Sequence, residues 1–195
     1  SKILKIDTRF KYNKDLGFFV ANNKISRRYF IEMERGFDLY QRGITHRGNN
    51  LFESYCLDLI DFNYQDIVID CGANYGDLFL GLENKIRQEN YITFEPGPNE
   101  FKCLSKSLPF AINNNLGLSN KKGKMNFYLL SEKGDSSVIK VENFREKIQI
   151  SVTTLDEYTK ENNIGTCKLL KLEAEGWEPE ILQGATNFIN KCEYV

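Results

Sequence analysis

The sequence contains few of the residues from which metal centres and membrane anchors are built. It has one histidine in 195 residues, and no group of histidine, cysteine and carboxylate residues has the spacing of a zinc site. It has no run of 18 or more apolar residues and no charged start followed by an apolar stretch and a cleavage site. We therefore expect no required metal, no membrane span and no signal peptide, and we expect a cytoplasmic protein.

Composition predicts one folded domain with reduced thiols. The five cysteines are odd in number, widely spaced and mostly set among apolar residues, which is typical of free thiols in a core rather than a disulfide framework. With 41% hydrophobic and 13% aromatic residues, the chain has enough apolar side chains for one sizeable core and a small additional segment.

Positive charge is concentrated in the first quarter of the chain. Residues 1–50 carry 11 Lys/Arg against 5 Asp/Glu, whereas residues 51–195 carry 15 against 22. The basic segment either contacts an anion or is a solvated surface. The solvated surface is favoured by charges that are scattered rather than clustered. Nucleic acid is a poor candidate partner, since the whole chain is not basic and carries no recognised RNA or DNA motif.

The hydrophobic pattern changes near residue 66. Before it, strand-like alternation at 3–10 and 29–34 and turn-rich residues at 35–48 precede a helical face at 49–62, with Asn49 or Asn50 as its N-cap. We predict that residues 1–65 form a small α+β cap on the substrate side and that residues 66–195 form the cofactor-binding domain.

From residue 66 onward, apolar strands alternate with helical patterns. This alternation predicts an α/β protein with a doubly wound, mostly parallel sheet, whose ligands bind beyond the carboxyl ends of the strands at the switch point. Helices are expected after Gly76, from Pro98, from the capping box that begins at Thr154, and from Pro179. The predicted strands are 67–70, 91–94, 110–112, 168–173 and 192–195, with an antiparallel excursion between 124 and 152.

The segment VIDCGANYGD, residues 68–77, carries the strongest functional signal. Gly72 and Gly76 lie at the mouth of the first strand, where they permit positive φ and a close approach of a ligand to the main chain. A dinucleotide-binding turn would have a glycine in place of Asn74, to admit a pyrophosphate. The strand-end acid Asp70 also disfavours a pyrophosphate, but it suits a cationic amino group.

A second carboxylate follows the next predicted strand. Glu95 comes directly after YITF, 23 residues beyond Gly72, where it can accept hydrogen bonds from ribose hydroxyls. Together the two acids and the turn favour S-adenosylmethionine over a nicotinamide dinucleotide, and favour a cofactor site over a turn that only links strand and helix.

Five segments resemble, in this order, the motifs of the FkbM-type S-adenosylmethionine-dependent methyltransferases. They are VIDCGANYGD, FEPGPNEF, NNNLGLSNKKGKMNFYL, VTTLDEY and LLKLEAEGWEPEILQGA, and the similarity covers about residues 66–195. The resemblance implies a class I, Rossmann-like fold and methyl transfer to a hydroxyl oxygen, often of a sugar. The expected acceptor is a glycan or a carbohydrate-type small molecule, and the basic N-terminal segment would also suit an anionic one.

The resemblance assigns cofactor-binding roles to residues of these motifs. Glu95 would bind the ribose diol, the loop that contains Asn115 and Leu116 would border the adenine, and the glycine turn would line the methionine end. The residues expected in the cofactor site are Asp70, Gly72, Ala73, Asn74, Gly76, Glu95, Pro96, Asn115 and Leu116.

The fourth-strand motif departs from the family pattern. The family usually reads Lys-Ile-Asp-Val-Glu-Gly, whereas residues 171–176 read Lys-Leu-Glu-Ala-Glu-Gly, so Glu173 replaces an aspartate. The extra methylene moves the carboxylate roughly 1.5 Å further from the backbone. We expect this change to alter substrate positioning, or to weaken a loosely held magnesium ion if one binds there.

An acceptor alcohol needs a nearby base as it attacks the sulfonium methyl carbon. Glu173 and Glu175 are the best-placed candidates, although acids at a strand end can also simply stabilise the following helix. Lys171 either anchors substrate or pairs with one of these acids. His46 has a pKa suited to a base near neutral pH, but a lone surface histidine is the plainer interpretation.

Two further segments are candidates for the acceptor side. Asp135, Ser136 and Ser137 would form a polar lip over the acceptor. Aromatic residues interleaved with arginines would either stack on a sugar and contact phosphate or carboxylate groups, or pack inside the cap; they are Tyr29, Phe30, Phe37 and Tyr40, with Arg27, Arg28 and Arg35.

Two other functions stay open. The first is a binding module that keeps the cofactor pocket but does not catalyse a reaction. The Glu173 substitution supports it, and so does the last residue, Val195, which lies inside the fifth predicted strand of a sheet that normally has seven strands. A nicotinamide-dependent oxidoreductase is disfavoured by the missing glycine. A fifth strand left at the edge would pair with another chain, so we expect a homo-oligomer through that edge.

Overall fold

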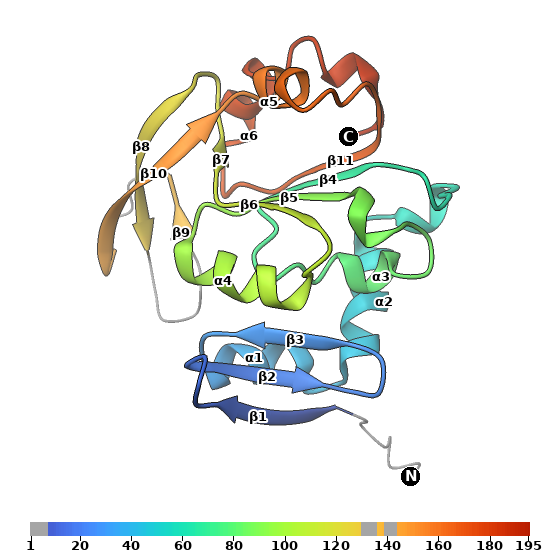
Figure 1. Ribbon diagram of the computed structural model, residues 1–195, viewed down its shortest axis with the longest axis vertical. Helices are drawn as coiled ribbons and strands as arrows, with labels where there is room; N and C mark the ends of the chain where they lie inside the picture. Colours follow the sequence, from blue (N-terminus) through green and yellow to red (C-terminus); the bar gives the residue numbers. More distant parts are fainter. Residues whose placement is uncertain (1–7, 130–135, 139–143) are drawn as a thin grey trace.

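A five-stranded parallel sheet forms the centre of the computed structural model, which describes residues 8–129, 136–138 and 144–195 (Figure 1). Its order is β12-β11-β4-β5-β6, so the chain order reverses between β4 and β11, as in Rossmann-like sheets. The predicted α/β class and parallel sheet are confirmed. The strands are β4 (Val68–Cys71), β5 (Tyr91–Phe94), β6 (Ile112–Asn114), β11 (Cys167–Leu172) and β12 (Cys192–Tyr194).

Helices cover both faces of this sheet, which explains why its strands are apolar at successive positions. Val68, Tyr91 and Leu169 belong to a core shared with α3 (Phe79–Leu82) and α4 (Pro98–Ser107). The neighbouring residues Ile69, Ile92 and Leu170 belong to a second core shared with α5 (Leu155–Glu161) and α6 (Glu178–Gln183). Because side chains alternate along a strand, each strand supplies both cores.

A second, four-stranded sheet lies beside the parallel one, on the left of Figure 1. The antiparallel pair predicted between residues 124 and 152 is confirmed by its two long strands, β8 (Gly123–Leu129) and β10 (Glu146–Thr153). The two short strands, β7 (Gly117–Leu118) and β9 (Ser136–Ser137), complete the sheet in the order β7-β10-β8-β9.

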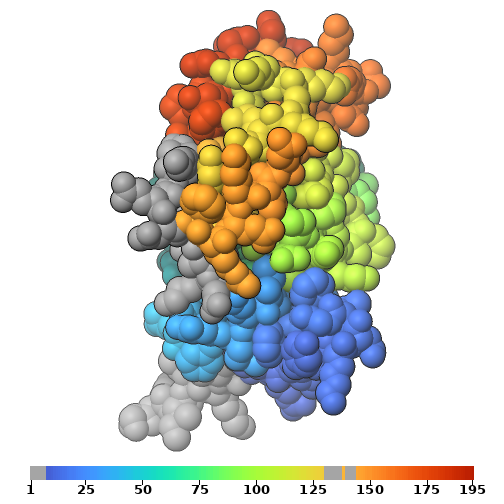
Figure 2. Space-filling model, turned by 90° about the vertical axis from the view of Figure 1, so that its left-hand side faces the viewer, coloured from blue at the N-terminus to red at the C-terminus, as the bar shows by residue number. Residues whose placement is uncertain are grey.

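The N-terminal part packs against the end of the molecule opposite α5 and α6 (Figures 1 and 2). Its buried Phe30, Tyr40 and Ile44 share one core with Tyr75 and Cys103 of the following part, so the two are joined by apolar contact. Its elements are an antiparallel sheet of β1 (Arg9–Asn13), β2 (Phe18–Asn22) and β3 (Arg27–Phe30), followed by α1 (Met33–Tyr40) and α2 (Ile44–Ser54).

The prediction of turns at residues 35–48 holds only between α1 and α2, near Gly43; it was wrong for the rest, because Gly36 and Gly48 lie inside helices and serve their packing. A Cβ at Gly36 would lie 1.9 Å from a ring atom of Phe30, so glycine lets α1 pack closely on the sheet. Helix α2 begins at Ile44, after Gly43 at φ 104°, and not at the asparagines expected to cap it. The interpretation of 29–34 as one strand was also wrong, since β3 ends at Phe30 and α1 begins at Met33.

Other predictions differ in their boundaries. The strand expected at 3–10 begins at Arg9, and residues 1–7 lie outside the described part. The third parallel strand begins at Ile112 rather than Phe110. The helix expected to run on from Pro179 ends at Gln183, and the next residue, Gly184, packs so closely that a Cβ there would lie 2.0 Å from the backbone carbonyl oxygen of Ser119.

The predicted helix cap at Thr154 is confirmed, whereas the prediction for the cysteines holds only in part. Thr154 caps α5 as predicted, since its Oγ1 accepts a hydrogen bond from the backbone N–H of Glu157 at 3.0 Å. Three of the five free cysteines are buried, but Cys56 is exposed in the turn after α2, contrary to the expectation of a core thiol. None of the helices in the described ranges is long and apolar enough to cross a membrane.

Helices α2 and α3 approach closely at Gly48. A Cβ at this position would lie 2.7 Å from Cβ of Leu80 and 2.9 Å from its carbonyl carbon. We expect Gly48→Ala to lower the free energy of unfolding by about 1–3 kcal/mol in urea denaturation, because the added methyl overpacks the contact. Alanine ordinarily stabilises a helix interior relative to glycine, so the sign of the change tests the packing.

Gly165→Ala is the matched control, because a Cβ there meets no atom within 4 Å. It should leave the unfolding midpoint nearly unchanged. A Gly48→Ala protein as stable as the wild type would contradict the close crossing of α2 and α3.

Candidate functional site

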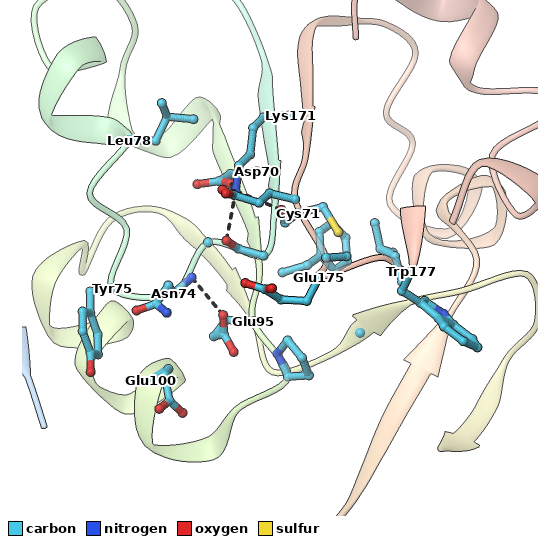
Figure 3. A pocket seen from close by; sticks show the side chains of 18 of the residues that line it. Asp70, Cys71, Asn74, Tyr75, Leu78, Glu95, Glu100, Lys171, Glu175 and Trp177 are labelled. Atoms are coloured by element: carbon cyan, nitrogen blue, oxygen red, sulfur yellow. Dashed lines mark hydrogen bonds and ion pairs between the residues drawn. The ribbon is translucent and has the colours of Figure 1, made fainter. Parts of the chain in front are cut away.

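One pocket lies at the carboxyl ends of β4, β5 and β11, at the switch point of the parallel sheet (Figure 3). Residues that end these strands line it, among them Cys71, Glu95 and Glu173. Side chains of the second sheet and of the N-terminal helices complete its wall. The predicted site residues that line it are Asp70, Gly72, Ala73, Asn74, Glu95, Pro96, Leu116, Lys171, Glu173 and Glu175.

The glycine turn has the positive φ angles that its sequence predicts. Gly72 has φ +74°, Gly76 has φ +80° and Asn74, in the left-handed region, has φ 49°. A Cβ at Gly72 would lie 1.9 Å from the carbonyl oxygen of Glu173, so this glycine lets the turn pass closely under the end of β11. Gly76 faces Leu104 and Leu108 and is not among the residues that line the pocket.

Lys171 holds the centre of the site. Its Nζ lies 3.0 Å from Oδ1 of Asp70 and 3.2 Å from Oε2 of Glu173, and it donates to the backbone carbonyls of Cys71 and Gly72 at 3.1 and 3.0 Å. Asp70, 1% exposed, also accepts a hydrogen bond from the hydroxyl of Tyr91. Of the two roles considered for Lys171, pairing with acids is therefore the one that the contacts support.

The protonation states around Lys171 follow from these contacts. Burial alone lowers the pKa of Lys171, but the charges of Asp70 and Glu173 raise it by more, so the ammonium stays charged. Partial burial raises the pKa of Glu173, but the hydrogen bond from Tyr55 and the charge of Lys171 bring it below its usual value. Burial and the same hydrogen bond raise the pKa of Tyr55 to about 12. The site thus holds an ionised Glu173 beside a neutral Tyr55 at pH 7.

Glu95 is buried and held by backbone donors. Its Oε2 accepts from the N–H of Asn74 at 2.8 Å, and its Oε1 accepts from the N–H of Gly97 at 2.7 Å. Burial and, next, the charge of Glu100 raise its pKa to about 7. Asn115 does not line the pocket; its Nδ2 donates to the carbonyls of Glu95 and Pro96 at 2.9 and 3.1 Å and so fixes the loop.

The N-terminal helices supply a wall that the sequence analysis did not identify as a unit. Arg35 and Leu39 of α1 line the pocket one turn apart, and Arg47, Leu51 and Tyr55 follow at the same spacing along α2 and its end. This i, i+4 spacing was visible in the sequence. Only Leu51 and Tyr55 were predicted to share a helix face; residues 35–48 were expected to be rich in turns, and nothing indicated that either segment met a cavity.

Asp77 at the end of the glycine turn was also missed. It is 7% exposed and accepts from the hydroxyl of Tyr40 at 2.7 Å and from Nε of Arg47 at 3.1 Å. Nε of the buried Arg28 lies 3.7 Å from the same carboxylate. These contacts tie the glycine turn to the N-terminal part.

The remaining candidates lie elsewhere. His46 is half-buried on α2 and is not among the residues that line the pocket. Of the proposed polar lip, Asp135 lies outside the described residues, and residues 136–137 form β9. Among the aromatic candidates, Tyr29, Phe30 and Tyr40 are buried in the N-terminal core, which supports cap packing over sugar stacking, while Phe37 is 53% exposed. The described residues contain no cluster of three or more His, Cys, Asp or Glu that could hold a metal ion.

The burial of the Asp70–Lys171 pair predicts a large effect of breaking it. Lys171→Met leaves the Asp70 carboxylate buried without its cation, so we expect the free energy of unfolding to fall by about 3–5 kcal/mol in urea denaturation. Adding Asp70→Asn should restore part of the loss, because the uncompensated charge is then removed as well.

Lys168→Met is the matched control on the same strand. Lys168 pairs at 2.7 Å with Glu193, which is 55% exposed, so water replaces the lost partner and the change should be much smaller. Equal losses of unfolding free energy for the two lysine variants would show that the buried Asp70–Lys171 pair contributes no more to stability than an exposed pair does.

Comparison with known proteins agrees with this geometry. The model of the Methyltransferase FkbM domain matches residues 70–195. "Methyltransferase 1" of Beauveria bassiana (strain ARSEF 2860) is 23% identical over 159 residues, covering 69% of this chain and 64% of the relative. "Methyltransferase sdnD" of Sordaria araneosa is 24% identical over 172 residues, covering 69% of this chain and 66% of the relative.

The chain spans slightly less than two thirds of the length of these curated relatives. No solved structure matches it significantly. The family match begins at Asp70, the acid of the glycine turn, and extends over more than half of the chain, through Glu95 and Lys171. The chain therefore belongs to the FkbM methyltransferase domain family.

Proposed function

We propose that this protein is an S-adenosylmethionine-dependent O-methyltransferase that acts on a hydroxyl of a carbohydrate-type acceptor. The observation that supports this most directly is that two different carboxylates line one pocket. Glu95 is buried beside the glycine turn, and Glu173 is ionised at the end of β11. The first suits a ribose diol and the second suits an acceptor hydroxyl.

Glu95 fits the ribose of the cofactor. Each of its oxygens already accepts one backbone hydrogen bond, from Asn74 and from Gly97, and each keeps a second lone-pair direction. Two neighbouring hydroxyls can therefore donate to one carboxylate whose position is fixed before they arrive. The adenine would lie toward Leu116, which lines the same pocket.

The charge of the pocket fits a cationic ligand. Lys171 contacts Asp70 and Glu173, and arginines contact Asp77, which leaves Glu95, Glu100 and Glu175 as acids that line the pocket without a lysine or arginine contact in the described part of the chain. A sulfonium and an ammonium group suit such a lining, whereas the pyrophosphate of a dinucleotide would be repelled.

Glu173 is the residue that we assign to the acceptor hydroxyl. The hydroxyl of Tyr55 and Nζ of Lys171 both contact its Oε2, which leaves Oε1 for the acceptor. When bound, S-adenosylmethionine supplies an electrophilic methyl group on sulfur. Glu173 would orient the attacking oxygen and accept its proton as the methyl group passes from sulfur to oxygen and the carbon–sulfur bond breaks, because its low pKa prevents it from ionising the alcohol beforehand.

The acceptor class rests on the family and on the wall of the pocket. FkbM-type enzymes often methylate sugar hydroxyls, and the N-terminal wall offers Tyr55 with Leu39 and Leu51 for the apolar face of such a ring. Residues 1–65 would then act as the substrate-side cap. Association of two chains through the outer strand β12 stays a prediction, as does the role of His46.

We expect the protein to bind the cofactor with an affinity that depends on pH. Isothermal titration should show saturable binding of S-adenosylhomocysteine and none of NAD, with Glu95→Ala weakening the former. Because the pKa of Glu95 is about 7, lowering the pH from 8 to 6 protonates it and should weaken binding about tenfold.

Glu100→Gln separates this cause from a general effect of acid. Removing the charge of Glu100 lowers the pKa of Glu95, so binding should persist to lower pH. Glu146→Gln, at the exposed first residue of β10, should leave the profile unchanged. A folded protein that binds neither ligand would overturn the proposed cofactor.

We expect turnover to depend on the Glu173 carboxylate. Release of S-adenosylhomocysteine is measured with a panel of sugars and methyl glycosides, which identifies a hydroxyl acceptor. With that acceptor, Glu173→Gln should lower kcat by roughly 10²–10⁴-fold, because a neutral amide cannot take the proton. Cofactor affinity should change little, since Glu95 is untouched.

Tyr55→Phe removes the hydrogen bond to Glu173 but keeps the ring, so it should lower kcat less than Glu173→Gln does. Full activity of Glu173→Gln would contradict the assignment. Cofactor binding without turnover on any acceptor would favour the alternative of a non-catalytic module.

A further inference from the structure

We propose that Arg35 binds an anionic group, a carboxylate or a phosphate, on a ligand of this same pocket. The inference rests on the proposed function, which supplies two sources for such a group: the amino-acid carboxylate of the cofactor and an acidic substituent on the acceptor. Arg35 precedes residue 70, where the family match begins, so the family match assigns it no role.

Nε of Arg35 is a buried donor without an acceptor in the described part of the chain. Arg35 lies on α1 one turn before Leu39, and both residues line the pocket. A buried donor is costly to leave unpaired, and a guanidinium fork fits two oxygens of a carboxylate or phosphate.

The other two cations of the pocket are already engaged. Nζ of Lys171 has two carboxylates and two backbone carbonyls within 3.2 Å. Nε of Arg47 donates to Asp77 at 3.1 Å. Among the cations that line the pocket, Arg35 is therefore the one whose buried Nε has no acceptor among the described residues.

The charge of Arg35 is felt at the wall of the pocket that the glycine turn forms. Burial raises the pKa of Tyr75, and the positive charge of Arg35 opposes this rise, so the guanidinium lies within electrostatic reach of that hydroxyl. Tyr75 follows Asn74 in the turn, and Figure 3 shows the two residues on one wall with Glu100. The amino-acid end of the cofactor is expected at this wall.

Charge complementarity supports the same assignment. The lining has an excess of acids, which suits the sulfonium and ammonium groups of S-adenosylmethionine but repels its carboxylate. A single cation at the turn removes that repulsion where the carboxylate would lie. An acidic acceptor would meet the same requirement for a local cation.

The test compares two adenosine ligands by isothermal titration. S-adenosylhomocysteine carries the amino-acid carboxylate, and 5′-methylthioadenosine lacks the amino-acid part. If the cofactor is the source, Arg35→Gln should weaken S-adenosylhomocysteine about tenfold or more and leave 5′-methylthioadenosine unchanged, while Arg35→Lys should retain part of the affinity. Arg42→Gln, an exposed arginine just after α1, is the matched control and should change neither.

A second arm tests the acceptor as the source. Wild-type protein saturated with S-adenosylhomocysteine is titrated with inorganic phosphate, and binding is followed by the shift of the thermal unfolding midpoint. If the acceptor supplies the anion, phosphate should raise the midpoint in the wild type and in Arg42→Gln but not in Arg35→Gln.

Two outcomes would overturn the proposal. Arg35→Gln could weaken both adenosine ligands equally, which would mean that Arg35 only supports the fold, or it could leave both arms unchanged. Failure of the proposed function is distinguishable, because the wild type would then bind neither adenosine ligand, while the phosphate arm on the unliganded protein would still test Arg35.

Discussion

The site depends on one buried ion pair at the switch point of the sheet. Asp70 and Lys171 face each other in the register of the neighbouring strands β4 and β11. Burying both charges carries a desolvation cost that a single Coulomb contact does not always offset. Here Tyr91 donates to the carboxylate, and two backbone carbonyls and Glu173 accept from the ammonium, so both ions have the additional partners that burial requires. The pair thereby fixes the glycine turn against the end of β11.

The N-terminal part is joined to this centre by polar contacts as well as by its core. Asp77, at the far end of the glycine turn, accepts from Tyr40 and Arg47, and Tyr55 donates to Glu173. Each contact connects a residue before the matched family domain to one within it. A pocket made by residues 70–195 alone would therefore lack the wall on which the acceptor is expected, and Glu173 would lose one of the two groups that orient it.

Sequence reasoning succeeded where local chemistry alone determines the structure. The apolar runs at 67–70 and 91–94, the hydroxyl of Thr154 and the acid after YITF each have one strong local interpretation. The structure has strands at 68–71 and 91–94, Thr154 as the cap of α5, and Glu95 directly after β5 in the pocket. Sequence reasoning failed at Gly36 and Gly48, because a glycine chosen for close packing looks like a glycine chosen for a turn. It also missed Asp77, and it named Arg35 as a contact for an anion without placing it in the pocket, since a charged residue reveals its position only once distant segments are brought together.

The substitution of aspartate by glutamate at position 173 has a physical reason in these contacts. A glutamate reaches roughly 1.5 Å further from the backbone than an aspartate does. At that extra length its Oε2 meets both the hydroxyl of Tyr55 and Nζ of Lys171. An aspartate would have to give up at least one of these partners unless the backbone moved, and Gly72 is packed so closely under the carbonyl of residue 173 that little movement is open to it. The departure from the family motif and the tyrosine that precedes the family domain are thus two parts of one arrangement, which weakens the substitution as an argument for a module without turnover.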